Sequence, residues 1–255
     1  MKAADNVPIV RHRECVMDMP ISVALRGRHA GDAAGRRAWR GVIQEWININ
    51  RVFSRDLSDS VISQFNRGEV TEADCPPEVQ EVMALGAHIQ RESHGAFSVY
   101  RRGTNGRMHL RPNGVVKGWA VERCAAHLQE LADTDFCLSA GGDMHCRSLD
   151  PNRPWRIGIE DPHQVKRVLA VLPVLNGGVA TSGTAYRGNH IVDARTGRPP
   201  THVAQVTVFA DSVTWADVDA TAAFALGPEA AAWLSGRAGR TGLVVWQDGS
   251  TSTID

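Results

Sequence analysis

Two oxygen-bearing side chains stand one helical turn apart in the carboxyl-terminal part of the chain. Asp217 and Thr221 are four positions apart in WADVDATAAFALG, which we expect to be helical, so their side chains would share one face. A carboxylate and a hydroxyl are oxygen ligands of the kind that Mg²⁺ accepts beside waters and substrate phosphates. The structural alternative is a helix-start charge at Asp217 and a back-bonding threonine at Thr221. Asp219 would point to another face, into solvent.

The segment VVKGWA (115–120) is a second candidate for contacting an anion or a metal ion. We expect it to join the end of a strand to the start of a helix, where amide groups can meet an anion. Lys117 would add a positive charge, and the carbonyl of Val116 would be within reach of a metal. Such junctions are common, so a purely structural turn is the alternative.

Two glycine-containing stretches could approach a phosphate-bearing ligand. Gly141-Gly142-Asp143 predicts a tight turn whose backbone admits a close ligand and whose carboxylate can accept hydrogen bonds, although such turns are also ordinary. The stretch 177–199, GGVATSGTAYRGNHIVDARTGRP, reads as a small-residue turn, a strand that emerges at His190 into a polar turn, and a Thr-Gly-Arg-Pro turn. A histidine is more often structural than catalytic, so both roles stay open for His190.

Composition excludes several classes of function. The 255 residues include 28 basic and 28 acidic side chains, so no overall field would attract nucleic acid or an anionic membrane. No apolar run approaches the length of a membrane span, and the polar amino terminus lacks a signal-peptide core, so we expect a cytoplasmic protein without membrane insertion. Five cysteines without a C-x-x-C pair favour reduced thiols over disulfides or a zinc site.

The elements that would position these groups mix helices and strands without regular alternation. The arginine-rich segment 26–40 predicts an exposed loop between a strand at 21–25 and a helix at 40–53. Apolar spacing predicts further helices after Pro76-Pro77 up to Gly95, at 117–131 and at 215–227. Strands are expected at 136–140, 155–161, 168–175, 204–210 and from 242, with a turn at 176–178. This order favours an α+β architecture.

The order of the motifs resembles the ApbE-type flavin transferases, the FAD:protein FMN transferase family. VVKGWAVER, LSAGGDM, PWRIGIEDP, GVATSGTAYRGNHIVDARTGRP and TWADVDATAAFALG are similar to its successive motifs, and VFSRDLSDSVISQFNRGE and IQRESHGAFSVY to its early segments. The likeness extends from residue 15 to residue 247. It implies one bilobed α+β domain over 1–255, made of two interlocked lobes with FAD in the cleft between them. It also implies Mg²⁺-dependent transfer of FMN from FAD to a Ser or Thr hydroxyl of an acceptor flavoprotein, with release of AMP.

The resemblance also assigns roles to individual positions. It implies a metal site made of Asp217, Thr221 and the Val116 carbonyl, and it implies that His190 or Asp217 orients or deprotonates the acceptor hydroxyl. The implied FAD pocket consists of Phe53, Ala96, Phe97, Trp119, Gly142, Asp143 and His190, with Thr181 and Ser182 shaping the same cleft.

Three departures from the family pattern leave other functions open. The chain reads VMDMPIS at 16–22 where the family has Met-Gly-Thr, Ser98 where it has aspartate, and Ala194 where it has proline. The first two changes remove contacts that the nucleotide would otherwise make. The alternatives are a noncatalytic FAD-binding or flavin-delivery protein, and a metal-dependent FAD pyrophosphatase that yields FMN and AMP. Because the metal pair is intact, we expect an active transferase.

Overall fold

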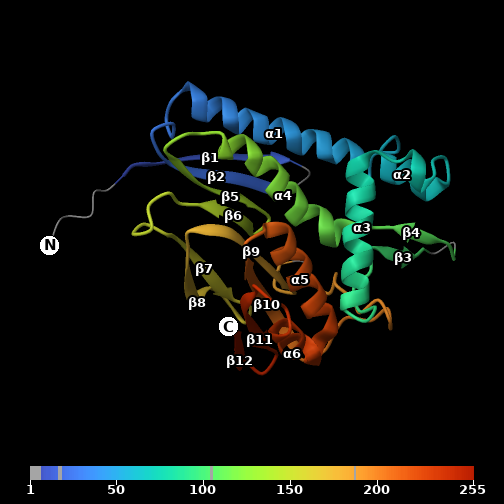
Figure 1. The fold of residues 1–255 in the computed structure, drawn as a ribbon. Coiled ribbons are helices and arrows are strands. Elements are labelled where there is room, and N and C mark those ends of the chain that lie inside the picture. Colours follow the sequence, from blue (N-terminus) through green and yellow to red (C-terminus); the bar gives the residue numbers. More distant parts are fainter. Residues whose placement is uncertain (1–6, 17–18, 104–105, 187) are drawn as a thin grey trace.

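An eight-stranded sheet organises the chain in the computed structural model, which describes residues 7–16, 19–103, 106–186 and 188–255 (Figure 1). Its strand order is β1-β2-β5-β6-β9-β10-β11-β12, and every neighbouring pair is antiparallel. The strands are β1 (Ile9–Val16), β2 (Met19–Gly27), β5 (Thr134–Ala140), β6 (Asp143–Arg147), β9 (Asn176–Gly183), β10 (Val203–Ala210), β11 (Thr241–Trp246) and β12 (Thr251–Ile254). Residues 1–6 and 17–18, which include part of the amino terminus and of VMDMPIS, lie outside the described residues.

The two faces of the sheet carry different layers. Three helices, α1 (Ala33–Phe53), α4 (Asn113–Gln129) and α5 (Val213–Leu226), cover one face, and the hairpin of β7 (Trp155–Asp161) and β8 (Gln164–Val174) packs on the other (Figure 1). The remaining elements are α2 (Val61–Arg67), α3 (Pro77–Glu92), α6 (Ala230–Ser235), the hairpin β3 (Tyr100–Arg102) and β4 (Met108–Leu110), and the short 3₁₀ turns η1 (Glu72–Asp74) and η2 (Gly227–Glu229). The expected mixture of helices and strands is confirmed.

The arginine-rich segment 26–40 is mostly not a loop, so that prediction is wrong. Residues 33–40 form the first two turns of α1, and Asp32 caps the helix by accepting hydrogen bonds from the amides of Ala34 and Gly35 at 2.8 and 3.1 Å. Trp39 is buried beneath this turn, whereas the arginines around it are exposed. The arginines form the solvent face of an amphipathic helix. Composition alone does not distinguish such a face from an exposed loop.

Two predicted junctions also differ from the structure. The segment 115–120 lies inside α4 rather than between a strand and a helix. The expected turn at 176–178 is wrong, because these residues begin the central strand β9. Its glycines meet a steric requirement: a Cβ at Gly178 would stand 2.2 Å from the Cα of Val213, the first residue of α5. The small residues there let a helix lie directly on the sheet.

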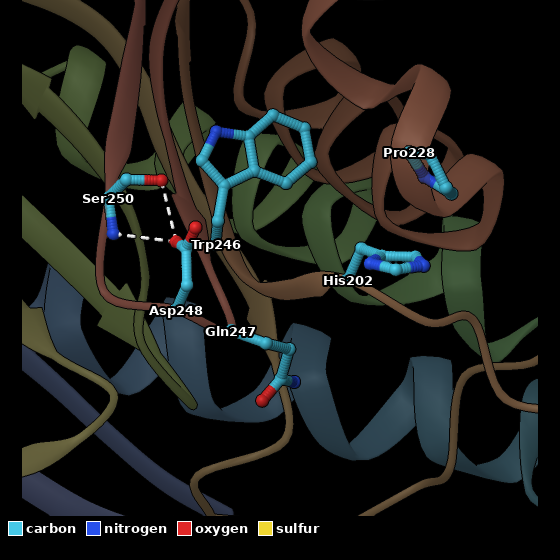
Figure 2. Close-up of a pocket in the computed structure, with 6 residues that line it drawn as sticks. All are labelled: His202, Pro228, Trp246, Gln247, Asp248 and Ser250. Carbon is cyan, nitrogen blue, oxygen red and sulfur yellow. Dashed lines mark hydrogen bonds between the residues drawn. The ribbon is translucent and has the colours of Figure 1, made fainter.

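An open depression lies beside the β11–β12 hairpin. It has a volume of about 490 Å³ and is lined by His202, Pro228, Trp246, Gln247, Asp248 and Ser250 (Figure 2). None of the residues that the sequence assigned to flavin or metal binding is in this set. Among the described residues, no helix combines the length and apolar character that crossing a membrane requires.

Candidate active site

A buried ionic cluster joins the sheet to the two helices that cover its centre. The ammonium of Lys117 in α4 lies 2.8 Å from Oδ2 of Asp143 in β6 and 3.3 Å from Oδ1 of Asp217 in α5. Asp143 is 0 % exposed and Asp217 is 1 % exposed. Two carboxylates therefore share one ammonium away from solvent, an arrangement that is costly unless further donors or a cation compensate the second negative charge.

The hairpin between β5 and β6 places Asp143. Gly141 and Gly142 make its two-residue turn with φ of 57° and 100°, a conformation that favours glycine, so the predicted tight turn is confirmed. Asp143 follows as the first residue of β6 and faces the helical layer. A Cβ built on Gly142 would meet no atom within 4 Å, so the backbone of this turn is open to an approaching ligand.

Contacts between α4 and α5 place Asp217. The amide of Gly118 donates a hydrogen bond of 2.8 Å to Oδ2 of Asp217. The two helices approach closely here because Gly118 has no side chain: a Cβ would stand 2.6 Å from the Cβ of Asp217.

Glu122, one turn after Gly118, fixes the start of α5. Its Oε2 accepts hydrogen bonds from the hydroxyls of Ser212 and Thr214, both 2.5 Å, and from the amide of Thr214 at 3.0 Å. These contacts satisfy donors at the first turn of the helix that carries Asp217. Neither Glu122 nor the pairing of Lys117 with two carboxylates had been anticipated; both are long-range contacts.

Strand β9 contributes a hydroxyl beside this cluster. Oγ of Ser182 lies 3.0 Å from Oγ1 of Thr221, so the structure brings together two positions that the sequence had assigned to flavin and metal binding. The side chain of Thr181 points to the opposite face of β9, where its hydroxyl lies 2.9 Å from that of Thr207. The structure therefore brings Ser182, and not the side chain of Thr181, next to Thr221.

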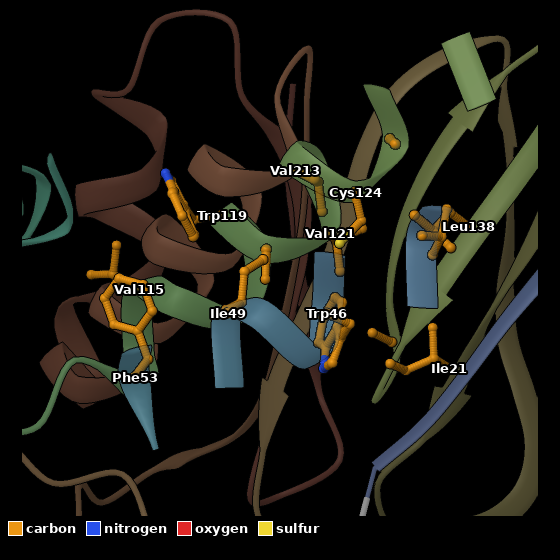
Figure 3. Packing of buried hydrophobic residues seen from close by; sticks show 14 of the residues in the cluster. Ile21, Trp46, Ile49, Phe53, Val115, Trp119, Val121, Cys124, Leu138 and Val213 are labelled. Carbon is orange, nitrogen blue, oxygen red and sulfur yellow. The ribbon is translucent and has the colours of Figure 1, made fainter. Parts of the chain in front are cut away.

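The aromatic residues expected to line a flavin pocket are packed in the core. The rings of Phe53 and Trp119 meet edge to face with centroids 5.5 Å apart between α1 and α4 (Figure 3). Phe53, Trp119 and Phe97 are each 5 % exposed, and Ala96 is fully buried. The Phe97 ring abuts Gly114 in the first turn of α4, close to the Thr221 methyl group. In this structure these side chains are part of the hydrophobic core.

His190 lies on an exposed loop, and the strand expected to lead to it is absent from that stretch as described. Its Nδ1 is 3.1 Å from the carbonyl of Gly188, and its own carbonyl accepts a 3.4 Å hydrogen bond from Arg101. The following turn is confirmed, because Asp193 and Arg198 form a bridge around it. These contacts hold the ring at the surface, so the structure does not place His190 in the ionic cluster.

The expectation that Asp219 is solvated is wrong. Asp219 is 0 % exposed and forms ion pairs with Arg237 at 2.9 Å and Arg240 at 2.6 Å. The reason is that α5 is apolar around its whole circumference and is buried on every side, so even the face opposite Asp217 is covered.

Burial and charge shift the protonation equilibria of the cluster. Removal from water raises the pKa of Asp143, and the neighbouring Asp217 carboxylate raises it further, while Lys117 opposes both effects. The pKa of Lys117 is raised because the attraction of Asp143 and Asp217 outweighs the effect of burial. The ammonium therefore stays charged, and with both carboxylates ionised the cluster would carry one net negative charge.

The donor set is suited to a hard cation that keeps other ligands. Asp217 and Thr221 offer a carboxylate and a hydroxyl one turn apart, and the surplus negative charge of the cluster favours a cation. Val116 lies in the first turns of α4, where its carbonyl retains a second lone pair. Within the described ranges, no three His, Cys, Asp or Glu side chains form a metal-binding group. Magnesium would therefore depend on hydroxyl, carbonyl and substrate oxygens.

Part of the chain is similar in sequence to known proteins. The sequence is 29% identical over 149 residues to the FAD:protein FMN transferase of Escherichia coli K12, covering 54% of this chain and 42% of that protein. It is 30% identical over 192 residues to the one from Rhodobacter capsulatus, covering 70% and 37%. The matched part thus spans about two fifths of these relatives.

Solved structures match almost the whole fold. The apo flavinyl transferase ApbE of Pseudomonas stutzeri aligns with a TM-score of 0.81 at 22% identity, covering 98% of this chain and 96% of that one. The ApbE protein of Thermotoga maritima aligns with a TM-score of 0.83 at 19% identity, covering 97% of each. The family model named ApbE matches residues 100–244, which contain the whole ionic cluster and the Ser182–Thr221 contact. The chain belongs to the ApbE family.

Proposed function

We propose that this chain transfers FMN from FAD to a Ser or Thr hydroxyl of an acceptor flavoprotein, with Mg²⁺ and with release of AMP. The observation that carries the proposal is the buried cluster of Lys117, Asp143 and Asp217 beside the Ser182–Thr221 hydroxyl pair. It lies inside the segment that matches the ApbE family, and curated relatives of that segment are named FAD:protein FMN transferase.

In this proposal Asp217, Thr221 and the Val116 carbonyl hold the magnesium ion. When bound, the ion neutralises charge on the FAD pyrophosphate. Asp217 is prepared for this role because Gly118 fixes one of its oxygens by a 2.8 Å hydrogen bond, while the other faces Lys117. Lys117 keeps the two carboxylates together and orients Asp143 at the open Gly142 turn.

The flavin nucleotide would lie against that turn. In this proposal Gly142 admits the ligand closely, Asp143 and Ser182 provide polar groups, and Thr181 shapes the cleft beside Ser182. Phe53, Ala96, Phe97 and Trp119, which the family likeness assigns to the flavin pocket, are at most 5 % exposed, so in this proposal they support the pocket from the core behind it.

The chemical step breaks one phosphoanhydride bond and forms one phosphoester. The acceptor oxygen attacks the phosphorus of the FMN half, AMP leaves with the bridging oxygen, and the hydroxyl proton passes to a base. We assign the role of this base to His190. In the tautomer in which Nδ1–H donates to the Gly188 carbonyl, Nε2 is left as a proton acceptor. Asp217 is less suited to this role because it is buried and, in this proposal, already binds the magnesium ion.

The test is mass spectrometry of acceptor peptides after incubation with the full chain, FAD and Mg²⁺. We expect an adduct of the mass of FMN on a Ser or Thr, with one AMP released per adduct. Asp217→Asn should abolish this Mg²⁺-dependent reaction, whereas the matched change Asp211→Asn, at an exposed carboxylate just before α5, should not. His190→Ala should slow turnover by about 10²- to 10⁴-fold, as expected for loss of a general base.

Two other outcomes would overturn the proposal. Release of FMN and AMP in equal amounts without an adduct on any peptide would identify a metal-dependent FAD pyrophosphatase. Retention of FAD without products would identify a noncatalytic FAD-binding or flavin-delivery protein. Unchanged turnover in Asp217→Asn would show that the metal site has been placed wrongly.

A further inference from the structure

Two cysteines stand directly opposite each other on neighbouring strands of the sheet. Cys137 in β5 is the register partner of Cys146 in β6, and their sulfurs are 3.4 Å apart. The register partners Ala140 and Asp143 flank the two-residue turn and so form a hydrogen-bonded pair. Hydrogen-bonded and non-hydrogen-bonded pairs alternate along an antiparallel ladder. Cys137 and Cys146, three register positions further from the turn, are therefore a non-hydrogen-bonded pair. Such pairs have Cα atoms about 4.5 Å apart, within the range that a disulfide spans.

The two thiols differ in access. Cys137 is half-buried, whereas Cys146 is 1 % exposed and packs in the small core between the sheet and the β7–β8 hairpin. An oxidant from solvent therefore meets Cys137 first. Cys146 lies behind it at contact distance, in the position of a resolving thiol.

The surroundings of Cys137 favour its thiolate. The hydrogen bond from the Cys146 thiol lowers the pKa of Cys137, and the positive charges of Arg11 and Arg26 add to this effect against the opposing effect of burial. Arg26 is held in place by Asp135 at 2.7 Å and by the ring of Trp155, whose centroid is 4.3 Å from the guanidinium carbon. The contact with Cys137 and the apolar surroundings raise the pKa of Cys146, which keeps its proton.

We propose that Cys137 and Cys146 form a peroxide-oxidisable dithiol, a modification site that closes to a disulfide across β5 and β6. The Cys137 thiolate attacks one oxygen of hydrogen peroxide, the O–O bond breaks, and sulfenic acid and hydroxide form. The Cys146 sulfur then attacks the Cys137 sulfur, an S–S bond forms, the S–O bond breaks, and its proton leaves with the departing oxygen as water. Overall, two thiols lose two electrons and two protons, and one peroxide becomes two waters.

The site does not depend on the proposed flavin transfer. The disulfide would close the hairpin three register positions below the Gly141–Gly142 turn and would hold together the strands that present Asp143. It would therefore act as a covalent clamp on the hairpin beneath the ionic cluster. Thiol-specific reduction would release the clamp.

A single tryptic peptide tests the proposal. No Lys or Arg occurs between Arg123 and Arg147, so trypsin yields one peptide, Cys124–Arg147, that contains Cys124 and both members of the pair. The folded full chain is treated with hydrogen peroxide, unfolded in an alkylating reagent and digested. We expect this peptide to carry one alkyl group, on Cys124, and to lack two hydrogen atoms. Prior treatment with a dithiol reductant should restore three alkyl groups.

Two variants isolate the roles of the two sulfurs. In Cys146→Ala the sulfenic acid at Cys137 should persist and react with a dimedone probe, whereas Cys137→Ala should leave Cys146 reduced. The exposed Cys15 serves as the internal control for peroxide exposure. Three alkyl groups on the wild-type peptide under conditions that oxidise Cys15 would overturn the proposal. A disulfide that joins Cys124 instead would also overturn it.

Discussion

The closest approach of α4 and α5 gives the sharpest test of how the cluster is built. Replacing Gly118 by alanine would place a methyl group 2.6 Å from the Cβ of Asp217 and 2.7 Å from the carbonyl oxygen of Val213. Both neighbours belong to the helix that carries Asp217, so neither can move without shifting α5. The same substitution pushes Asp217 away from the amide that now binds its carboxylate at 2.8 Å.

The expected cost follows from three terms. Overpacking of a close contact costs about 1–3 kcal/mol. Loss of a hydrogen bond to a charged acceptor costs about 1.5–3 kcal/mol. The better helix propensity of alanine returns about 1 kcal/mol. Gly118→Ala should therefore lower the free energy of unfolding by about 3 kcal/mol.

Equilibrium unfolding in urea measures this difference, with Gly31→Ala as the matched control. A Cβ on Gly31 would lie 3.8 Å from its nearest neighbour, a methyl group of Val10, so alanine fits there without displacement. We expect the control to leave stability within about 1 kcal/mol of the parent chain or to raise it. Equal stability of the two variants would refute the claim that Gly118 is required for the contact between α4 and α5.

Two further predictions concern the same layer. Glu122→Ala should destabilise the chain by about 2–3 kcal/mol in the same urea assay, because three donors at the start of α5 lose their acceptor. Glu122→Gln should cost less because it keeps an oxygen at that position. Equal losses of stability in the two variants would argue against the capping role of Glu122. Because burial raises the native pKa of Asp143, the native state holds a proton that the unfolded chain releases above about pH 4. Stability should fall as the pH rises from there to the native pKa of Asp143, and Asp143→Asn should remove this slope in urea titrations at several pH values. If the pH dependence of stability were the same in Asp143→Asn as in the parent chain, the raised pKa of Asp143 would be contradicted.

Local patterns predicted those parts of the site that depend on neighbouring residues in the chain. The spacing of Asp217 and Thr221 placed both on one helix, and the Gly141–Gly142 pair predicted the turn before Asp143, because a helical period and a positive φ are local requirements. The position of Thr221 next to Ser182 depends on β9 lying under α5. That packing rests on Gly178, which the sequence alone had suggested to be part of a turn.

The contacts that give the cluster its charge balance were beyond local reasoning. The sequence predicts that Lys117 contacts the anionic group of a ligand, whereas in the structure it pairs with two carboxylates of the chain itself. One of them lies 100 residues further along the chain. Asp219 was expected in solvent, because its position opposite Asp217 does not reveal that Arg237 and Arg240 fold over that face. Long-range pairing of charges requires knowledge of which elements pack together.

The pairing of β2 with β5 has a consequence for how the chain folds. These strands are neighbours in the sheet, yet the ion pair between Arg26 and Asp135 at their edge closes a separation of 109 residues. Other pairs in the sheet, such as β5 with β6 and β11 with β12, join segments separated only by short turns. Short-range hairpins form early, whereas closing a long loop carries a larger entropic cost before its contacts are made. The step that joins the amino-terminal hairpin to the rest of the sheet should therefore set the folding rate.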